Sequence, residues 1–159
     1  MKPDTIKLSA LLDSPANFLA LGAGLGLAPK APGTFGTLLG IPLLLVMPQS
    51  LAAYLAVLCV LSLVGVWSCH LCARSLGVHD HPGIVWDEVV GYLITMIAVP
   101  RSVWWVVIGF AMFRLFDILK PWPISWIDRQ VHGGLGIMLD DMLAALFALA
   151  VMHLLLFLF

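Results

Sequence analysis

The chain has 159 residues and a formal net charge of −1; hydrophobic residues make up 62% of it and charged residues 11%. Soluble domains average about 45–50% apolar and about 25% charged residues, so this composition excludes an ordinary soluble domain and favours an integral membrane protein. The near-zero net charge also provides no basic field of the kind that attracts nucleic acid, so we expect no nucleic-acid partner.

Five apolar runs follow one another along the chain. Run 50–69 is uncharged and about 30 Å long as a helix, which matches the hydrocarbon core of a bilayer, and run 142–159 is the second clear span. Three runs are short for a full crossing, so we expect extended, tilted, broken or re-entrant helices there: 35–47, 89–99 and 103–113. The pattern predicts an all-α membrane bundle with several short or re-entrant helices. It forms one domain over 1–159, of which about 1–17 is a flexible or interfacial segment.

The charged residues divide unequally between the two sides of this predicted bundle. If the N-terminus is inside and every run crosses, seven of the eight Lys and Arg residues lie inside and only Arg101 lies outside. This distribution obeys the positive-inside rule. All nine acidic residues fall on the same inner side, so we predict a loop cluster on the cytoplasmic face that carries nearly all the ionisable chemistry.

The first of these loops contains the glycine-rich stretch GAGLGLAPKAPGTFGT. Backbone N–H groups of 33–36 at the start of an apolar helix can bind a phosphate, with Lys30 and the hydroxyl of Thr34 beside them. The stretch lacks the G-K-[ST] of a P-loop, and a plain membrane-entry turn explains it equally well.

Two acidic pairs border apolar runs: Asp87 and Glu88 in GIVWDEVVG, and Asp140 and Asp141 in GIMLDDMLAAL. Adjacent helical residues point about 100° apart, so neither pair is expected to chelate one ion unaided. Carboxylates are also favoured at helix starts by the helix dipole, and Asp140 is a plausible N-cap. That structural explanation accounts for one carboxylate of each pair better than for both.

Between these pairs, FRLFDILKPWP spaces Arg114, Asp117 and Lys120 three residues apart, which places alternating charges on adjoining faces of one helix. The structural alternative is a set of interfacial anchors with an internal ion pair. The next loop, RQVHGGLG, contains His132, which has the chemistry of a general acid.

Acidic groups gathered at a membrane edge repel one another and need compensating cations. Arg114, Lys120 and Arg129 are candidates, and so is a divalent ion, for which oxygen-only ligands favour Mg²⁺ or Mn²⁺. The signatures of thiol, aspartyl-phosphate and histidine-nucleophile phosphatases are absent from the sequence. If the chain cleaves a phosphate, metal-activated water is therefore the simplest nucleophile.

Four ordered blocks together resemble the phosphatidylglycerophosphatase A family: GLGLAPKAPGTFGTL, GVHDHPGIVWDEVVG, FRLFDILKPWPISWIDRQV and HGGLGIMLDD. The resemblance extends over about 18–145. It implies an all-helical enzyme of the bacterial inner membrane, multi-pass and with its site facing the cytoplasm. The implied reaction is Mg²⁺-dependent hydrolysis of phosphatidylglycerophosphate to phosphatidylglycerol and inorganic phosphate, with membrane lipids as the surroundings.

From the resemblance and the residues we assign provisional roles. The expected metal ligands are Asp87, Glu88, Asp117, Asp140 and Asp141. The expected catalytic residues are Asp87, Asp141 and His132. The expected substrate-binding residues are Lys30, Thr34, Arg114, Lys120 and Arg129. Two alternatives stay open: a phosphatase acting on another lipid or prenyl phosphate, and a non-enzymatic component of a small membrane transporter.

Overall fold

The structure, a computed structural model, describes residues 6, 8–78 and 80–159, and every regular element among them is a helix. In chain order the elements are α1 (Leu8–Leu12), α2 (Pro15–Ala20), the 3₁₀ segment η1 (Gly22–Leu27), α3 (Pro32–Val46), α4 (Leu51–Leu76), α5 (Trp86–Thr95), α6 (Val103–Leu119), α7 (Ile124–Gln130) and α8 (Gly133–Leu158). The predicted all-α class is confirmed for this part of the chain.

Each predicted apolar run overlaps a helix, although run 89–99 is helical only to Thr95, and several helices continue into the polar sequence beside their run. Helix α4 has 26 residues and α6 has 17, both longer than the runs that predicted them. Helix α8 begins at Gly133, nine residues before the apolar run starts, and its N-cap is His132. The prediction that Asp140 and Asp141 open this helix is therefore wrong, because both lie in its third turn.

Glycine permits the close packing of the first turn of α8. A β-carbon at Gly134 would overlap the carbonyl oxygen of Val66 on α4, and one at Gly136 would overlap the carbonyl oxygen of Val131. Only glycine lets the first turn of α8 approach α4 this closely. A boundary drawn from apolarity alone misses such a start, because close packing and not hydrophobicity decides it.

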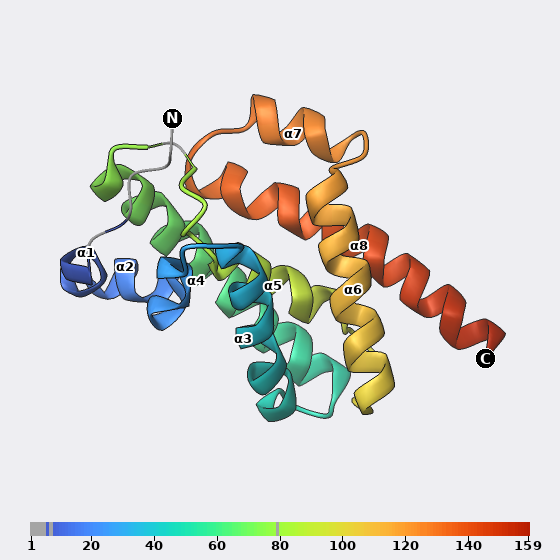
Figure 1. The fold of residues 1–159 in the computed structure, drawn as a ribbon. Coiled ribbons are helices and arrows are strands. Elements are labelled where there is room, and N and C mark those ends of the chain that lie inside the picture. Colours follow the sequence, from blue (N-terminus) through green and yellow to red (C-terminus); the bar gives the residue numbers. More distant parts are fainter. Residues whose placement is uncertain (1–5, 7, 79) are drawn as a thin grey trace.

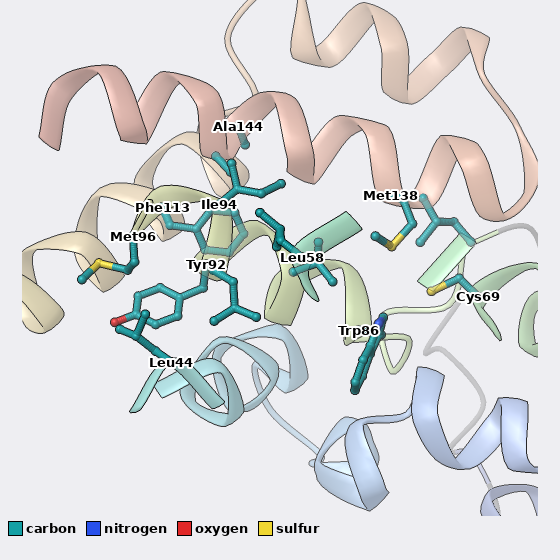
Figure 2. Packing of buried hydrophobic residues seen from close by; sticks show 14 of the residues in the cluster. Leu44, Leu58, Cys69, Trp86, Tyr92, Ile94, Met96, Phe113, Met138 and Ala144 are labelled. Carbon is teal, nitrogen blue, oxygen red and sulfur yellow. The ribbon is translucent and has the colours of Figure 1, made fainter. Parts of the chain in front are cut away.

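Helix α5 is the centre of the molecule although it has only 10 residues. All of its residues except Glu88 are buried, and α3, α4, α6 and α8 pack against it. Figure 2 shows Tyr92 and Ile94 between α8 above and α3 below, with Phe113 and Met96 beside them. After α5 the chain leaves the helix and turns through Ala98 (φ 56°). Irregular backbone is tolerated inside a membrane protein when protein covers it. This explains why the helix in the predicted run 89–99 can be short.

The long helices alternate in direction, so the connections gather at two opposite ends. At one end Arg101 donates from Nη1 to the Met47 carbonyl (2.7 Å) and from Nη2 to the Pro48 carbonyl (2.8 Å), which ties the α3–α4 turn to the α5–α6 turn. At the other end lie η1, the segment before α5, and α7 with its flanking turns. Figure 1 shows α7 toward the top and the α3–α4 turn toward the bottom. We call these the α7 end and the Arg101 end.

The outer surfaces of the long helices are apolar and exposed. Helices α4 and α8 are long and apolar enough to cross a membrane, and only 22% and 28% of their most apolar windows are buried. A core helix of a soluble protein would be mostly buried. Large apolar side chains on α4, α6 and α8 remain open to the surroundings, including Leu63, Val107 and Leu154. Exposed apolar side chains in this number suggest that the protein associates with a membrane.

The N-terminal segment expected to be flexible or interfacial is described only in part, because residues 1–5 and 7 lie outside the described residues. Its described part contains α1 and the start of α2. Asn17 is buried there and donates from Nδ2 to the Ala10 carbonyl (2.8 Å) and to the Ser75 hydroxyl at the end of α4 (3.3 Å). The character of the remaining residues stays a prediction.

Gly91 supplies a test of the close packing around α5. A β-carbon there would lie 2.5 Å from Cε2 of Phe113 and 3.3 Å from the carbonyl oxygen of Asp141. We expect Gly91→Ala to lower the free energy of unfolding by about 1–3 kcal/mol, the usual cost of overpacking. Denaturant titration in detergent micelles measures it. The exposed Ala111→Val on α6 is the control and should change stability by less than about 0.5 kcal/mol; equal effects of the two substitutions would contradict this packing.

Candidate metal centre

The first turn of α5 brings Asp87 and Glu88 to the α7 end of the molecule. Asp87 is buried, and the side chain of Glu88 is 13% exposed. The dipole of α5 favours carboxylates at its N-terminus, worth typically 0.3–1 kcal/mol, but this is small against the cost of burying two adjacent charges. The helix start alone therefore does not explain the pair.

Asp141 joins this pair from α8. One carboxylate oxygen each of Asp87, Glu88 and Asp141 lies within 4.8 Å of the other two. Adjacent helical carboxylates are not expected to chelate one ion unaided, and here Asp141 supplies a third carboxylate from another helix. The close approach of α8 to α5 at Gly91 makes this possible, because the Asp141 backbone lies against that glycine.

Helix α6 adds a charged pair to the same place. Nη1 of Arg114 lies 2.5 Å from Oδ2 of Asp117 and 3.6 Å from Oε1 of Glu88. The Asp117 carboxylate in turn interacts with Asp141. The predicted shared face of Arg114 and Asp117 is confirmed, and it points toward α5 and α8.

Lys120 does not continue that face. It is the C-cap of α6 in the left-handed conformation (φ 41°), and its ammonium lies 2.8 Å from Oδ1 of Asp128 on α7 and 2.5 Å from Oδ2 of Asp140. Burial alone would lower the pKa of Lys120, but hydrogen bonds and charge interactions with the two carboxylates raise it above its usual range. Lys120 is therefore a fixed cation that links α6, α7 and α8.

We call five acidic residues the carboxylate cluster: Asp87, Glu88, Asp117, Asp140 and Asp141. They outnumber the two cations among them, Arg114 and Lys120. Several of their buried oxygens have no hydrogen-bond partner among the described residues: Asp87 Oδ1, Glu88 Oε2, Asp140 Oδ1 and Asp141 Oδ2. Buried polar atoms are normally satisfied, so such a group needs an explanation. Oxygen ligands and surplus negative charge are what Mg²⁺ or a similar hard cation requires.

The start of α3 closes the site from another side. A β-carbon at Gly33 would overlap Oε1 of Glu88 and would lie 3.0 Å from Nη1 of Arg114. Only glycine therefore fits at this position in the first turn of α3. Buried Thr37, one turn later, donates its hydroxyl to the Gly33 carbonyl (2.9 Å) and holds this turn in place. The backbone of the glycine-rich loop is thus brought to the cluster, and its role in binding phosphate stays a prediction.

Three other predicted residues lie on the surface of the α7 end. Lys30 is exposed before α3, and Arg129 is exposed on α7. His132 is exposed at the N-cap of α8, with Nδ1 3.1 Å from the Gln130 carbonyl. At about 1.5 Å per residue, it precedes Asp140 by about 12 Å along the helix axis. Thr34 is half-buried beside Gly33. The roles assigned to these residues stay predictions.

Two further acidic residues lie near the site. Asp128 binds Lys120, and exposed Asp80 acts electrostatically on Asp87 and Asp140. Neither residue has a spacing in the sequence that predicts its partner, because each is brought to the site by the course of a loop or a short helix.

Comparison with known proteins agrees with the sequence blocks. The family model described as phosphatidylglycerophosphatase A matches residues 18–156. The phosphatidylglycerophosphatase A of Escherichia coli K12 is 44% identical over 154 residues, which cover 94% of this chain and 88% of that protein. The protein of the same name from Haemophilus influenzae Rd is 44% identical over 150 residues, covering 91% and 90%. A Bacteroides thetaiotaomicron protein provisionally named a phosphatidylinositol-3-phosphatase is 34% identical over 139 residues, covering 82% and 86%. No solved structure matches the chain significantly.

The carboxylate cluster predicts an unusual pH dependence of stability for protein from which divalent cations have been removed. Burial, followed by the charge of Asp141, raises the pKa of Glu88 from 4.5 to about 8, and burial together with the Glu88 charge raises the pKa of Asp87. The folded state then binds these protons more tightly than the unfolded state, so stability is greatest at low pH and falls as the pH rises toward 8. We expect the unfolding midpoint measured in EDTA to decrease as the pH is raised from 5 to 8. The Glu88→Gln substitution should make the slope of the midpoint against pH smaller.

The exposed Asp13→Asn is the control for this measurement and should leave the slope as in the wild type. A midpoint that is constant or rises across this range in the stripped wild-type protein would contradict the burial of an uncompensated carboxylate cluster.

Proposed function

Because the chain belongs to the phosphatidylglycerophosphatase A family, we propose that it hydrolyses the terminal phosphate of phosphatidylglycerophosphate at the carboxylate cluster. The products are phosphatidylglycerol and inorganic phosphate. The single observation that supports this place for the reaction is the convergence of Asp87, Glu88 and Asp141 within 4.8 Å, with Arg114 beside them. The chain is thus a phosphoric monoester hydrolase.

A divalent cation, Mg²⁺ in this proposal, fits the cluster. Asp87, Glu88 and Asp141 are its ligands, with Asp117 and Asp140 as further candidates. The buried carboxylate oxygens without partners support this assignment, because one dication would satisfy them and offset their charge. When bound, Mg²⁺ would neutralise charge on the phosphate and activate water for attack on phosphorus.

The chain's own residues hold the phosphate in place. Arg114 is oriented by Asp117 and Glu88, so its guanidinium is fixed before substrate arrives, and it can stabilise negative charge as the phosphate ester bond breaks. The backbone of Gly33, in the first turn of α3, lies against the Glu88 carboxylate and Arg114, and we assign this helix N-terminus to binding of the phosphate. Lys120 adds a second fixed positive charge at Asp140.

Proton transfers complete the reaction. Hydrolysis needs an acceptor for the proton that the attacking water loses and a donor for the glycerol oxygen that leaves. We assign the acceptor to a carboxylate of Asp87 or Asp141, both buried in the cluster. The same carboxyl group then returns this proton to the glycerol oxygen as its bond to phosphorus breaks. His132 is assigned to proton exchange at the surface of the α7 end. Lys30, Thr34 and Arg129 are assigned to binding of the headgroup as it enters.

The proposed setting is the bacterial inner membrane, crossed several times, with the α7 end toward the cytoplasm. Of the six basic residues that the structure describes, five lie at the α7 end and one at the opposite end, in agreement with the positive-inside rule. Trp122 and Trp126, 79% and 56% exposed, lie at the α7 end and suit an interfacial belt. The acyl chains of the substrate stay in the bilayer while the headgroup reaches the cluster.

One alternative substrate class follows from the Bacteroides thetaiotaomicron relative, whose provisional name refers to a different phosphorylated lipid. Phosphate release from a panel of phosphatidylglycerophosphate, phosphatidylinositol phosphate, phosphatidate and prenyl phosphates measures the preference directly. A transporter component is disfavoured, because among the described residues the carboxylates lie at the α7 end and do not line a path between the two ends.

Removing one carboxylate tests the site. We expect Asp87→Asn or Asp141→Asn to reduce kcat for phosphate release by at least about 10³-fold, since each removes a ligand and its charge. The same substitutions should abolish the rise in unfolding midpoint that Mg²⁺ produces in the wild-type protein. Phosphate assay and thermal unfolding with Mg²⁺ or EDTA measure both effects.

Asp13→Asn is the charge-matched control and should retain both activity and stabilisation by Mg²⁺. Full activity of the Asp87 or Asp141 variant would remove that residue from the site, and a wild-type enzyme that is fully active in EDTA would overturn the metal assignment.

Gly33 tests the contribution of α3. A methyl group there would displace the Glu88 carboxylate and Arg114, so we expect Gly33→Ala to lower kcat about 10²-fold while the protein still inserts into membranes. Gly77→Ala is the control: it strains a left-handed residue (φ 69°) with nothing within 4 Å of the new β-carbon. It should cost about 1 kcal/mol of stability and leave kcat unchanged. Equal losses of kcat in the two variants would show that backbone strain alone explains the effect.

A further inference from the structure

A second polar site lies at the Arg101 end, on the opposite side of the bundle from the carboxylate cluster. A cavity of about 280 Å³ opens between the α3–α4 turn and the α5–α6 turn. Its walls combine two long polar side chains with apolar and aromatic ones: Gln49, Leu51, Tyr54, Met96, Val99 and Arg101. Nothing in the proposed phosphatase reaction uses this cavity.

Arg101 is the fixed cation of the cavity. Its two terminal nitrogens donate to the Met47 and Pro48 carbonyls, and its guanidinium carbon lies 5.8 Å from the centre of the Tyr54 ring. The ring is itself fixed, because the Tyr54 hydroxyl donates to the Leu93 carbonyl (2.7 Å). Carbonyl partners orient the guanidinium without cancelling its charge, and they occupy only two of its five N–H groups.

The charge of Arg101 has no carboxylate partner among the residues that the structure describes. The acidic residues of these ranges belong to the α7 end, in the α1–α2 connection, the segment before α5, the carboxylate cluster and α7. Two helices also begin beside the cavity. Helix α4 starts at Leu51, and α6 starts at Val103 with no side-chain hydrogen bond from its N-cap Ser102. Helix N-termini add positive potential to that of the guanidinium.

The surroundings identify the kind of anion. Leu51 in the wall of the cavity is 52% exposed, and Val103 and Trp104, which follow Arg101 at the start of α6, are 76% and 78% exposed, as expected for side chains that face lipid. Tryptophan is typical of the level of the headgroups. A fixed cation at this level, beside apolar surface, suits the phosphate of a lipid whose acyl chains lie along α4 and α6.

We propose that the cavity at the Arg101 end binds the headgroup of an anionic phospholipid from the leaflet opposite the carboxylate cluster. Arg101 and the adjoining helix N-termini hold the phosphate, and Gln49 donates a hydrogen bond to the headgroup. The bound lipid covers the two turns that Arg101 ties together.

Gln49→Glu tests this without removing the Arg101 clamp, because it places a carboxylate in the cavity where the phosphate would lie. Gln130→Glu on α7 is the matched control, since it makes the same change at the other end of the molecule. The purified full chain, in EDTA, is titrated with dioleoylphosphatidylglycerol and with dioleoylphosphatidylcholine, and native mass spectrometry measures the lipid retained.

We expect wild-type protein and Gln130→Glu to bind the anionic lipid about tenfold more tightly than the zwitterionic lipid, and Gln49→Glu to lose that preference. Equal binding of the two lipids by the wild type, or an unchanged preference in Gln49→Glu, would overturn the proposal. A loss of the preference for anionic lipid in Gln130→Glu alone would also overturn the proposal, because it would place the lipid at the α7 end. Displacement of the lipid by equimolar inorganic phosphate would overturn it too, by showing a site for small anions. Binding is measured directly, so these outcomes do not depend on the proposed phosphatase activity.

Discussion

Three carboxylates from two helices share one small space between α5 and α8, and two more lie beside them. At 4.8 Å and an effective dielectric constant of 20, two like unit charges repel by roughly 3–4 kcal/mol. The three pairs among Asp87, Glu88 and Asp141 would together cost roughly 10 kcal/mol, which is comparable to the whole stability of a typical domain, about 5–15 kcal/mol. Raised pKa values, Arg114 and Lys120 offset part of the repulsion. In the function proposed above, a hard dication would offset the remainder and make the same arrangement a site for phosphate hydrolysis.

The fold brings these charges together by placing a short helix at its centre. Because α5 is enclosed by α3, α4, α6 and α8, the first turn of α5 is adjacent to the start of α3, the end of α6 and the third turn of α8. Glycine permits the closest of these approaches: Gly33 leaves space for the Glu88 carboxylate, and Gly91 lets α8 reach α5 beside Asp141. The glycines are therefore part of the site although they carry no functional group.

The two ends of the bundle have opposite electrostatic character. The α7 end carries a surplus of buried carboxylates for which cations must be supplied, whereas the Arg101 end carries one cation held by backbone carbonyls. The surface between the ends is apolar. This division agrees with the two proposals above, in which a lipid phosphate binds at the α7 end and a lipid headgroup binds at the Arg101 end.

Much of this arrangement was predictable from the residues. The apolar runs predicted the long helices, the distribution of Lys, Arg, Asp and Glu predicted a single charged end, and the ordered blocks identified the family. The cluster members were also named, from the family resemblance together with the acidic residues beside the apolar runs. Misplacement of the start of α8 came from reading helix boundaries from hydrophobicity alone, which carries no information about the close approach that Gly134 allows.

The sequence by itself therefore determined the composition of the site and the side of the bundle on which it lies, since both follow from which residue types a hydrocarbon layer accepts. Only the tertiary structure decided which carboxylates meet. Asp141 joins Asp87 and Glu88, whereas its neighbour Asp140 is held by Lys120, and Lys30 and His132 stay on the surface. These choices depend on the relative rotation and height of packed helices, which contacts between residues far apart in the chain set and local sequence does not.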